Sequence, residues 1–535
     1  MIPFSAPVAD ILFTLQHVAG VGTLPQWDDE LCPDIIRHFA DFADSEIAPT
    51  DEPGDRQGCR LENGRVLMPD VYQPVFASYI EQGWSGLTID EQYGGQGMGA
   101  SLQAAIVEIF TGSCHALQMI CGLVPGANRT LMEFGSESQR QHYLPLLADG
   151  TCLSTMCLSE PGAGSDLSRV RTRAVQTAEG WRLNGEKIFI SGGGQNLSDN
   201  VFHLVLARSG EMNSGVRGLS LFACLTRTED GKDNGLSVAR IEEKMGIHGS
   251  PTCQLVFDNT VAELIGAEGE GLRAMFTMMN HARLDVALQG VAHAARAHQI
   301  AQDYANQRLQ GRKSDGSPAY LSDHADVQRM LNTQDALALG SRALCHETLV
   351  ILEAGNDADL VEFLTPVCKV FCTEAGIQCA DLGIQTLGGY GYLTEYRVEQ
   401  TLRDARITAI YEGANGIHCL TLATRLLHVN GGASWQAFQS FVEELAQYDN
   451  DNLIVRALDQ WKLATTRLQK MEDPAGAAHA YMQLTANLAY HGMWCKMASV
   501  KHYANSPERI ACLFDFVKSR SRPLFDYWHS LIMHN

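Results

Sequence analysis

Apolar residues recur at the spacing of amphipathic helices over much of the first 150 positions. The pattern is clearest in residues 32–49, in residues 71–84 and in the longer apolar stretch from Leu102 to Ile120. Residues 136–147 open with a serine, a residue preferred at helix N-termini, and predict a short capped helix. We therefore predict a helical region that extends to about Gly150.

After Gly150 the pattern changes to short alternating runs that are separated by turn residues. These runs occupy residues 181–192, 201–210, 218–227 and 253–260. Alternation of apolar and polar positions over such short lengths is typical of half-buried strands. The pattern thus predicts a β domain that ends at roughly Gly266.

Within this region, Asn184-Gly185 stands between two alternating runs and predicts a hairpin turn. The strand after it would place Phe189 and Ser191 on one face and Ile188 and Ile190 on the other. An aromatic ring beside a hydroxyl could cover a flat cofactor and bond to its edge, but an ordinary hairpin explains the same pattern.

From about residue 268 the chain returns to long helical patterns, and a further helical stretch runs from about Gly432 to the end. A glycine-rich loop at 428–434 opens this last stretch, and a second break falls at 471–477. The predicted fold is α+β and multidomain. Its five parts are an N-terminal extension (1–39), an N-terminal helical domain (40–150), a middle β-barrel-like domain (151–267), a C-terminal four-helix bundle (268–430) and an additional C-terminal helical domain (431–535).

The composition is that of an ordinary globular protein, with 45% hydrophobic and 19% charged residues among 535. The net charge of −22 argues against a general nucleic-acid partner, because phosphate backbones attract basic surfaces. The 15 cysteines are scattered, and the closest pair is Cys368 and Cys372. We expect reduced core cysteines, with no disulfide framework and no metal site.

The first twenty residues have no basic start before their apolar stretch, unlike a signal or transit peptide. No apolar run is expected to approach the length of a membrane span. These features predict a cytoplasmic protein without a membrane partner.

Three glycine-containing stretches could carry chemistry. Residues 158–166, LSEPGAGSD, form a loop whose backbone could approach a ligand closely and present N–H groups to an anion. Residues 385–392 place a glycine cluster after an amphipathic helix, as helix C-caps do. In residues 402–416 Glu412 follows an apolar run, where partial burial would raise the pKa of its carboxyl and suit it as a general base.

Taken together, the order and types of these stretches resemble the acyl-CoA dehydrogenase family. LSEPGAGSD is similar to the family's first signature, DARITAIYEGANGIH to its second, and EKMGIHGSPTCQLVFDN to its β-domain signature. The flanking sequences resemble the branch with an extended N-terminus and an extra C-terminal helical domain, which includes 3-(methylthio)propionyl-CoA dehydrogenase. The family resemblance covers roughly residues 40–427.

This resemblance implies FAD bound between the β domain and the bundle, with help from a neighbouring subunit. The residues placed at the flavin and its pyrophosphate would be Leu158, Ser159, Gly164 and Ser165. The residues beside the isoalloxazine ring would be Phe189, Ile190 and Ser191. Arg308 would reach the pyrophosphate of the FAD held mainly by the partner subunit. The adenosine half would contact Gln385, Gly388 and Gly389.

The resemblance also implies a reaction. Glu412 would remove the α-proton of an acyl-CoA, flavin N5 would accept the β-hydride, and a trans-2-enoyl-CoA would form. Substrate contacts would come from Ser165, Asn280, Arg283, Tyr411 and Gly413. Electron-transfer flavoprotein would take the electrons, and a homodimer is favoured among homo-oligomers.

Two alternatives stay open at this point. One is a flavin-containing binding protein on the same fold, such as the DNA-repair-associated relatives, although Glu412 and the acidic composition count against it. The other is an acyl-CoA oxidase, which these motifs cannot separate from a dehydrogenase because oxygen reactivity depends on access to the flavin.

Overall fold

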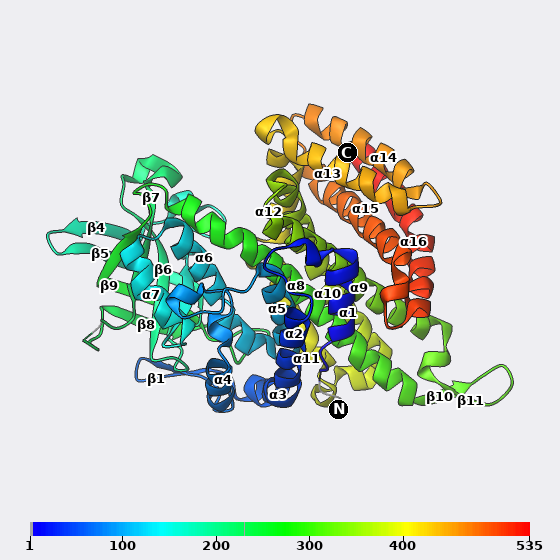
Figure 1. Ribbon diagram of the computed structural model, residues 1–535, viewed down its shortest axis with the longest axis horizontal. Helices are drawn as coiled ribbons and strands as arrows, with labels where there is room; N and C mark the ends of the chain where they lie inside the picture. Colours follow the sequence, from blue (N-terminus) through cyan, green and yellow to red (C-terminus); the bar gives the residue numbers. More distant parts are fainter. Residues whose placement is uncertain (1–3, 229, 535) are drawn as a thin grey trace. The chain divides into compact units, whose positions relative to one another are not determined.

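A computed structural model describes residues 4–228 and 230–534, and for residues 277, 278 and 280 it describes the backbone alone. The chain divides into two compact units, which we treat separately (Figure 1). The sheet unit consists of Ser45–Gly99 and Ser113–Ala282. The bundle unit consists of Met1–Asp44, Ala100–Gly112 and Arg283–Asn535.

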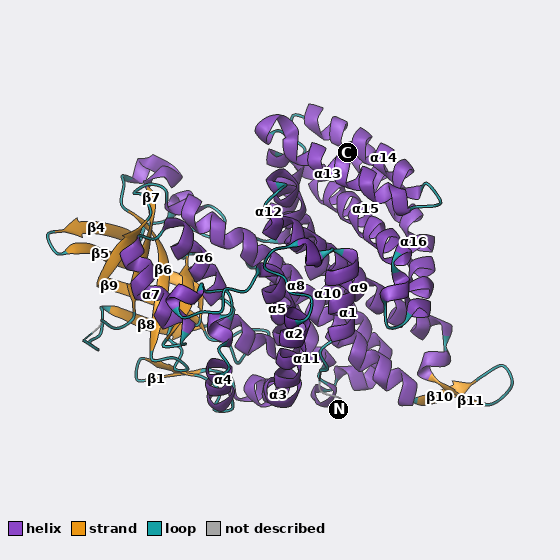
Figure 2. Cartoon of the chain, in the orientation of Figure 1, coloured by secondary structure: helices purple, strands orange, loops and turns teal. Residues whose placement is uncertain are grey.

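The sheet unit combines short helices with strands (Figure 2). Its helices are α3 (Ala48–Gln57), α4 (Tyr72–Glu81), α6 (Val124–Phe134) and α7 (Glu137–Ala148). Ser136 caps α7, with its side chain accepting from Gln139 N while the Gln139 side chain accepts from Ser136 N, which confirms the predicted capped helix. The ring of Tyr143 on α7 packs 4.7 Å from the ring of Phe202 in the sheet.

A seven-stranded sheet forms the centre of this unit. Its strands are β3 (Cys152–Cys157), β4 (Arg173–Thr177), β5 (Gly180–Ser191), β6 (Asn200–Arg208), β7 (Leu219–Leu225), β8 (Leu236–Ile241) and β9 (Thr252–Ile265). The order is β3-β6-β4-β5-β9-β7, β8 pairs with β9, and β7 pairs with β6 as well, so the path returns to β6. A separate short hairpin joins β1 (Arg60–Glu62) and β2 (Arg65–Leu67).

The hairpin predicted at Asn184-Gly185 is wrong. Both residues lie inside β5, and the turn comes earlier, where Thr177 pairs with Gly180. At Gly185 the pairing with β9 is irregular, and a Cβ there would come within 2.7 Å of Thr172. The extra residue of this bulge lies on β9, where Asp258 and Asn259 stand opposite Asn184, and glycine is needed at position 185 because the backbone of Thr172 approaches closely.

The predicted alternation around Phe189 is also interrupted. Two residues of β5 stand opposite one residue of β9 between the Lys187 and Ile190 pairings, and Phe189 has φ +60°. Lys187 and Ile190 are buried, and the Phe189 ring is 63% exposed. A bulge shifts the side-chain period by one position, so Phe189 turns to solvent while Ile190 joins the core of the sheet.

In its described residues the bundle unit has helices and one small hairpin. Its long helices are α8 (Gly271–Gln307, from Arg283 on), α9 (Ala325–Ala354) and α10 (Ala358–Leu387), and its short ones are α1 (Val8–Leu12), α2 (Leu31–Phe42), α11 (Val398–Ala405) and α12 (Asn415–Ala423). The hairpin pairs β10 (Leu309–Arg312) with β11 (Pro318–Tyr320). The helices that follow are α13 (Ala433–Leu445), α14 (Leu453–Lys470), α15 (Ala478–Ser499) and α16 (Pro507–His534).

The last four helices share one hydrophobic core with the bundle helices. Phe363 of α10 packs 4.9 Å from Phe438 of α13 and 6.2 Å from Trp461 of α14, measured between ring centroids. His491 and Trp494 on α15 are buried in the same unit. The N-terminal segment is tied to this unit as well, since Arg509 of α16 donates to Asp10 at 2.9 Å.

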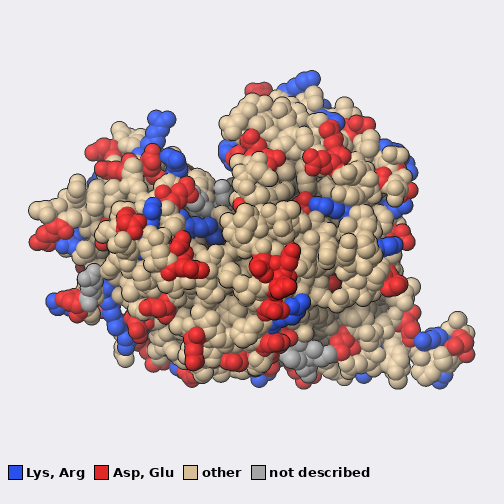
Figure 3. Space-filling view, viewed as in Figure 1, with Lys and Arg blue, Asp and Glu red and all other residues tan. Residues whose placement is uncertain are grey.

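One expectation about membrane spans needs correction. Among the described residues, α5 (Ala100–Cys121) is long and apolar enough to cross a bilayer by length and composition, although no such run was expected. Its apolar window is entirely buried, and a helix enclosed on all sides is apolar all round. Lysine, arginine and acidic side chains are interspersed over the visible face of each unit (Figure 3).

Candidate active site

Glu412 lies in a short loop of the bundle unit, between the 3-10 turn η11 (Arg406–Ala409) and helix α12. Its φ is +54° and that of Gly413 is +95°, so two successive residues adopt left-handed backbone. For a residue with a side chain this conformation costs on the order of 1 kcal/mol or more and persists only where the surroundings hold it. A Cβ at position 413 would come within 2.7 Å of His418 Nε2, which makes glycine necessary there.

Three side chains hold this loop. The His418 imidazole donates from Nε2 to the Glu412 carbonyl at 3.1 Å, and Lys369 Nζ donates to the Gly413 carbonyl at 2.8 Å. Tyr411 donates its hydroxyl to the Gln289 side-chain oxygen. Burial lowers the pKa of His418 to about 4, so its ring is neutral and one ring nitrogen carries the donated proton.

The Glu412 carboxyl has two properties that suit a base. Its Oε2 is buried and has no hydrogen-bond partner within the described part of the chain. Burial raises the pKa of Glu412, the Arg283 guanidinium and the Lys369 ammonium oppose this rise, and Asp285 adds to it. A carboxylate with a raised pKa and an unused lone pair can accept a proton from a weak carbon acid.

Both cations next to Glu412 are themselves affected by burial. Burial lowers the pKa of Lys369 to about 8, although the Glu412 carboxylate acts to raise it. Burial also lowers the pKa of Arg283, again against the influence of Glu412. The site therefore holds two positive charges and one carboxylate in a poorly hydrated space, where charge interactions are stronger than in water.

The first signature loop belongs to the sheet unit and is anchored by a buried ion pair. Lys187 Nζ lies 2.9 Å from Glu160 Oε1 and also donates to the Leu158 carbonyl at 2.8 Å. Glu160 further accepts from the main-chain N–H groups of Arg171 at 2.7 Å and Thr172 at 3.0 Å. Burial acts to raise the pKa of Glu160, but Lys187 and these donors outweigh it and hold the pKa below its ordinary value. Glu160 is therefore a structural carboxylate that anchors the loop.

Beyond this anchor the loop is open. Gly164 and Ser165 are exposed, no atom lies within 4 Å of a Cβ built on Gly164, and Ser159 is half-buried. Phe189 in the same unit presents an exposed ring from a strained, left-handed backbone, a combination that marks functional sites. An exposed ring, bare glycine backbone and serine hydroxyls fit a flat cofactor that carries phosphate groups. Ile190 can offer only its main chain, because its side chain is buried in the sheet core.

A second group of predicted cofactor residues lies at one end of α8 and α10 in the bundle unit. Arg308 follows α8, and its guanidinium carbon is 5.6 Å from the centre of the Tyr390 ring. Gln385, Gly388 and Gly389 are exposed around the end of α10, and Gly388 with φ +62° is the C-cap residue. This confirms the predicted C-cap and places an exposed cation beside an open glycine turn.

Of the predicted substrate residues, Tyr411 and Gly413 adjoin Glu412, and Arg283 acts on its charge. Asn280 is in α8, and its side chain lies outside what the structure describes. Sequence reasoning missed Lys369, His418 and Gln289. A lysine inside the apolar run of residues 364–372 was a usable signal, because a buried lysine needs a partner.

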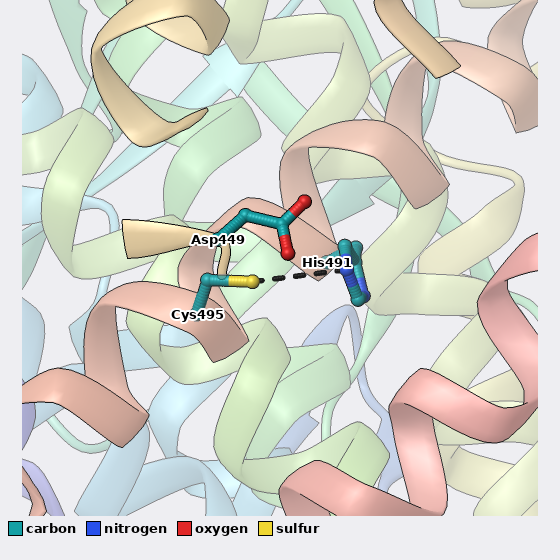
Figure 4. A group of neighbouring side chains, drawn as sticks. All are labelled: Asp449, His491 and Cys495. Carbon is teal, nitrogen blue, oxygen red and sulfur yellow. Dashed lines mark hydrogen bonds between the residues drawn. The ribbon is translucent and has the colours of Figure 1, made fainter. Parts of the chain in front are cut away.

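One group of side chains outside this site has the composition of a metal centre. Asp449, His491 and Cys495 offer ligand atoms within 4.8 Å of one another (Figure 4). Each already has a partner: Asp449 accepts from the N–H groups of Asp451 and Ile454 at 3.0 and 2.6 Å, and His491 lies 3.0 Å from Ser521 Oγ and 3.7 Å from Cys495 Sγ. Asp449 thus satisfies the start of α14, and the cluster is explained as a buried hydrogen-bond network.

Comparison with known proteins gives a consistent result. Residues 33–151, 155–260 and 269–427 match the N-terminal, middle and C-terminal domains of acyl-CoA dehydrogenase. The chain is similar to 3-methylmercaptopropionyl-CoA dehydrogenase of Ruegeria pomeroyi, with 39% identity over 463 residues that cover 82% of this chain and 79% of the relative.

Solved structures agree on the fold. Butyryl-CoA dehydrogenase from Megasphaera elsdenii has a TM-score of 0.66 at 26% identity and covers 75% of this chain and 99% of that one. An acyl-CoA dehydrogenase complexed with FAD from Bacillus anthracis has a TM-score of 0.79 at 22% identity and covers 97% of this chain and 91% of that one. The fold therefore has helical N- and C-terminal domains around a central β-sheet domain, while the finer barrel-like and four-helix descriptions and the five domain boundaries stay predictions. Three domains in the family's order and a dehydrogenase relative matched over most of both chains establish that this chain belongs to the acyl-CoA dehydrogenase family and is an oxidoreductase.

Proposed function

We propose that this enzyme oxidises the α,β C–C bond of an acyl-CoA thioester to a trans-2-enoyl-CoA, and that Glu412 takes the α-proton. The proposal is supported by the surroundings of this carboxyl. Its Oε2 is buried and accepts no hydrogen bond in the described part of the chain, and its pKa is raised. Three side chains also hold the loop that carries it. These are the requirements for a positioned base that acts on a weak carbon acid.

The cofactor is FAD, which accepts the β-hydrogen as a hydride at flavin N5 when it is bound. Leu158, Ser159, Gly164, Ser165, Phe189 and Ser191, with the main chain of Ile190, would bind it from the sheet unit. Arg308, Gln385, Gly388 and Gly389 would bind the pyrophosphate and adenosine parts of an FAD shared between subunits. The support is the open loop, the exposed Phe189 ring and the exposed Arg308.

The remaining residues of the bundle site would orient the substrate. The Glu412 main-chain N–H would donate to the thioester oxygen as negative charge develops on it. Gly413 leaves room beside the carboxylate, and the charge of Arg283 opposes the rise in the pKa of Glu412 and so favours its ionised form. Ser165, Asn280, Arg283 and Tyr411 would contact the acyl-CoA itself.

Partners and assembly belong to the same proposal. Electron-transfer flavoprotein would reoxidise the enzyme, and a homodimer is expected because Arg308 would serve a neighbouring subunit's FAD. A solution mass of four subunits would contradict the dimer. Reoxidation by molecular oxygen at the rate of the flavoprotein would make the enzyme an oxidase instead.

The test of the base is Glu412→Gln, which keeps the size of the side chain and removes its basicity. We expect bound FAD to be retained and its anaerobic bleaching by an accepted acyl-CoA to slow by several orders of magnitude. 3-Methylmercaptopropionyl-CoA and butyryl-CoA are the first substrates to screen, given the relative and the solved structure described above. Glu395→Gln is the matched control, since Glu395 is an exposed carboxylate nearby in sequence. Bleaching at an unchanged rate in Glu412→Gln would place the base elsewhere.

A further inference from the structure

Lys369 is fully buried in the middle of α10, where an unpaired lysine would be strongly unfavourable. Its ammonium donates to the Gly413 carbonyl and to Asn415 Oδ1, both at 2.8 Å. Gly413 follows Glu412 directly, and Asn415 is the first residue of α12. A single cation thus holds both ends of the strained turn that follows the catalytic carboxylate.

The network continues from Asn415 to α10. Asn415 Nδ2 donates to Thr373 Oγ1 at 3.2 Å and to Glu374 Oε1 at 3.3 Å. Thr373 and Glu374 lie one turn further along the helix that carries Lys369. The orientation of Asn415 therefore depends on Glu374, which has a second oxygen to satisfy.

That second oxygen is held by the C-terminal segment. Gln483 of α15 is buried, and its Nε2 donates to Glu374 Oε2 at 2.6 Å. Helix α12, which begins at Asn415, also packs along α15. Two independent contacts thus connect the helices that follow Gly432 to the loop that carries Glu412.

We propose that the C-terminal helical segment is a positioning element of the active site: Gln483 holds Glu374, and Glu374 with Asn415 holds Lys369 against the main chain of the Glu412 loop. Lys369, Glu374 and Gln483 are positioning residues, since they act through the loop. This inference rests on the proposed role of Glu412. It assigns a part in catalysis to a segment whose sequence carries no catalytic motif.

The charged groups around Glu412 determine the expected effect of each substitution. Helix α8 contributes Arg283 and Asp285, α10 contributes Lys369 and Glu374, and α12 contributes His418. Lys369→Met removes a positive charge that favours the ionised form of Glu412. The acidic limb of the pH–rate profile should therefore move to higher pH in this variant, in addition to a lower rate.

Gln483 carries no charge and touches no reacting group, so Gln483→Met tests position alone. We expect flavin bleaching to slow by about tenfold or more, which is what losing a hydrogen bond to a charged group typically costs. FAD content and the pH at half-maximal rate should stay unchanged. Lys496→Met is the matched control: Lys496 links the same helix to Glu347 of α9 at 2.9 Å but is remote from Glu374 in the network.

A swap variant separates positioning from general damage. Gln483→Glu sets two carboxylates against each other and should lose rate, whereas Glu374→Gln combined with Gln483→Glu restores an amide–carboxylate pair and should recover it. The amide introduced at position 374 could still accept from Asn415 through its oxygen and donate through its nitrogen to the carboxylate introduced at position 483. The measurement is anaerobic stopped-flow bleaching on the full-length holoenzyme.

The outcomes are distinguishable. Wild-type bleaching in Glu412→Gln would overturn the proposed function. A slow Glu412→Gln together with wild-type rates in Gln483→Met and Gln483→Glu, or a swap that fails to recover, would overturn the positioning role while leaving the base in place. Equal losses in Gln483→Met and Lys496→Met would show that only the stability of α15 matters, and would also overturn it.

Discussion

The buried ion pair at the base of the first signature loop gives the sharpest prediction about stability. The side chains of Lys187 and Glu160 are 0% and 6% exposed. Lys187→Met would leave the Glu160 carboxylate buried with the hydrogen-bond donors of Arg171 and Thr172 but without its cation. It would also remove the donor to the Leu158 carbonyl, at the start of the loop assigned to FAD.

The size of the stability loss in Lys187→Met depends on the charge that remains unpaired. Removing one partner of a buried ion pair costs about 3–5 kcal/mol, because the other charge stays out of water. Two surviving amide donors should hold the loss near the lower limit, at about 3 kcal/mol. For a unit of this size that corresponds to a fall of roughly 6–12 °C in the melting temperature.

The dependence of stability on pH gives a second, independent test of this ion pair. The pKa of Glu160 is held below its ordinary value, so the pair contributes stability that is complete above the ordinary carboxyl pKa and is lost as the pH falls through the lowered one. In Lys187→Met the burial of Glu160 is no longer opposed by a cation, so the pKa rises instead. Protonation then relieves the penalty, so the loss of stability in the variant should become smaller as the pH falls toward the ordinary carboxyl pKa.

Thermal unfolding followed by circular dichroism and by release of flavin fluorescence measures both effects. Glu160→Gln combined with Lys187→Met removes the stranded charge and should be more stable than Lys187→Met alone. A loss below about 1 kcal/mol in the single variant, or a double variant as unstable as the single, would refute the view that the pair anchors this loop.

Three further predictions concern the cofactor, the bundle unit and the buried histidine network. Arg308→Ala should lose FAD on dilution while staying folded, whereas Arg312→Ala on the neighbouring hairpin should not; equal FAD affinity in both variants would remove the pyrophosphate role. Arg509→Met removes the cation that bridges the carboxylates of Asp10 and Asp335 and leaves them the longer contacts to Arg342 and His298, both at 3.8 Å. The free energy of unfolding should fall by about 2 kcal/mol, and an unfolding curve that matches wild type would show that neither acid depends on Arg509. Elemental analysis should find no stoichiometric metal, since the partners of His491 are already filled, and a bound ion lost in His491→Ala would reverse that interpretation.

The local sequence determined much of this protein. Helix periodicity, alternation in the β region, the Ser136 cap and the Gly388 C-cap depend on residues a few positions apart, so they can be predicted from the chain alone. The order of the signature stretches was enough to identify the family and to single out Glu412. Its burial could be expected from the apolar run before it.

Other features depend on residues far apart in the chain, and only the tertiary structure decided them. Asn184-Gly185 is compatible with a turn or with a strand interior, and the pairing of β5 with β9 and the close approach of Thr172 decide for the strand interior. Lys369 donates a hydrogen bond to Gly413, 44 positions later, and Glu374 accepts one from Gln483, 109 positions later. A sequence shows which residues can donate, accept or carry charge, but long-range packing determines which of them meet, because burial makes each such group depend on the one partner within reach.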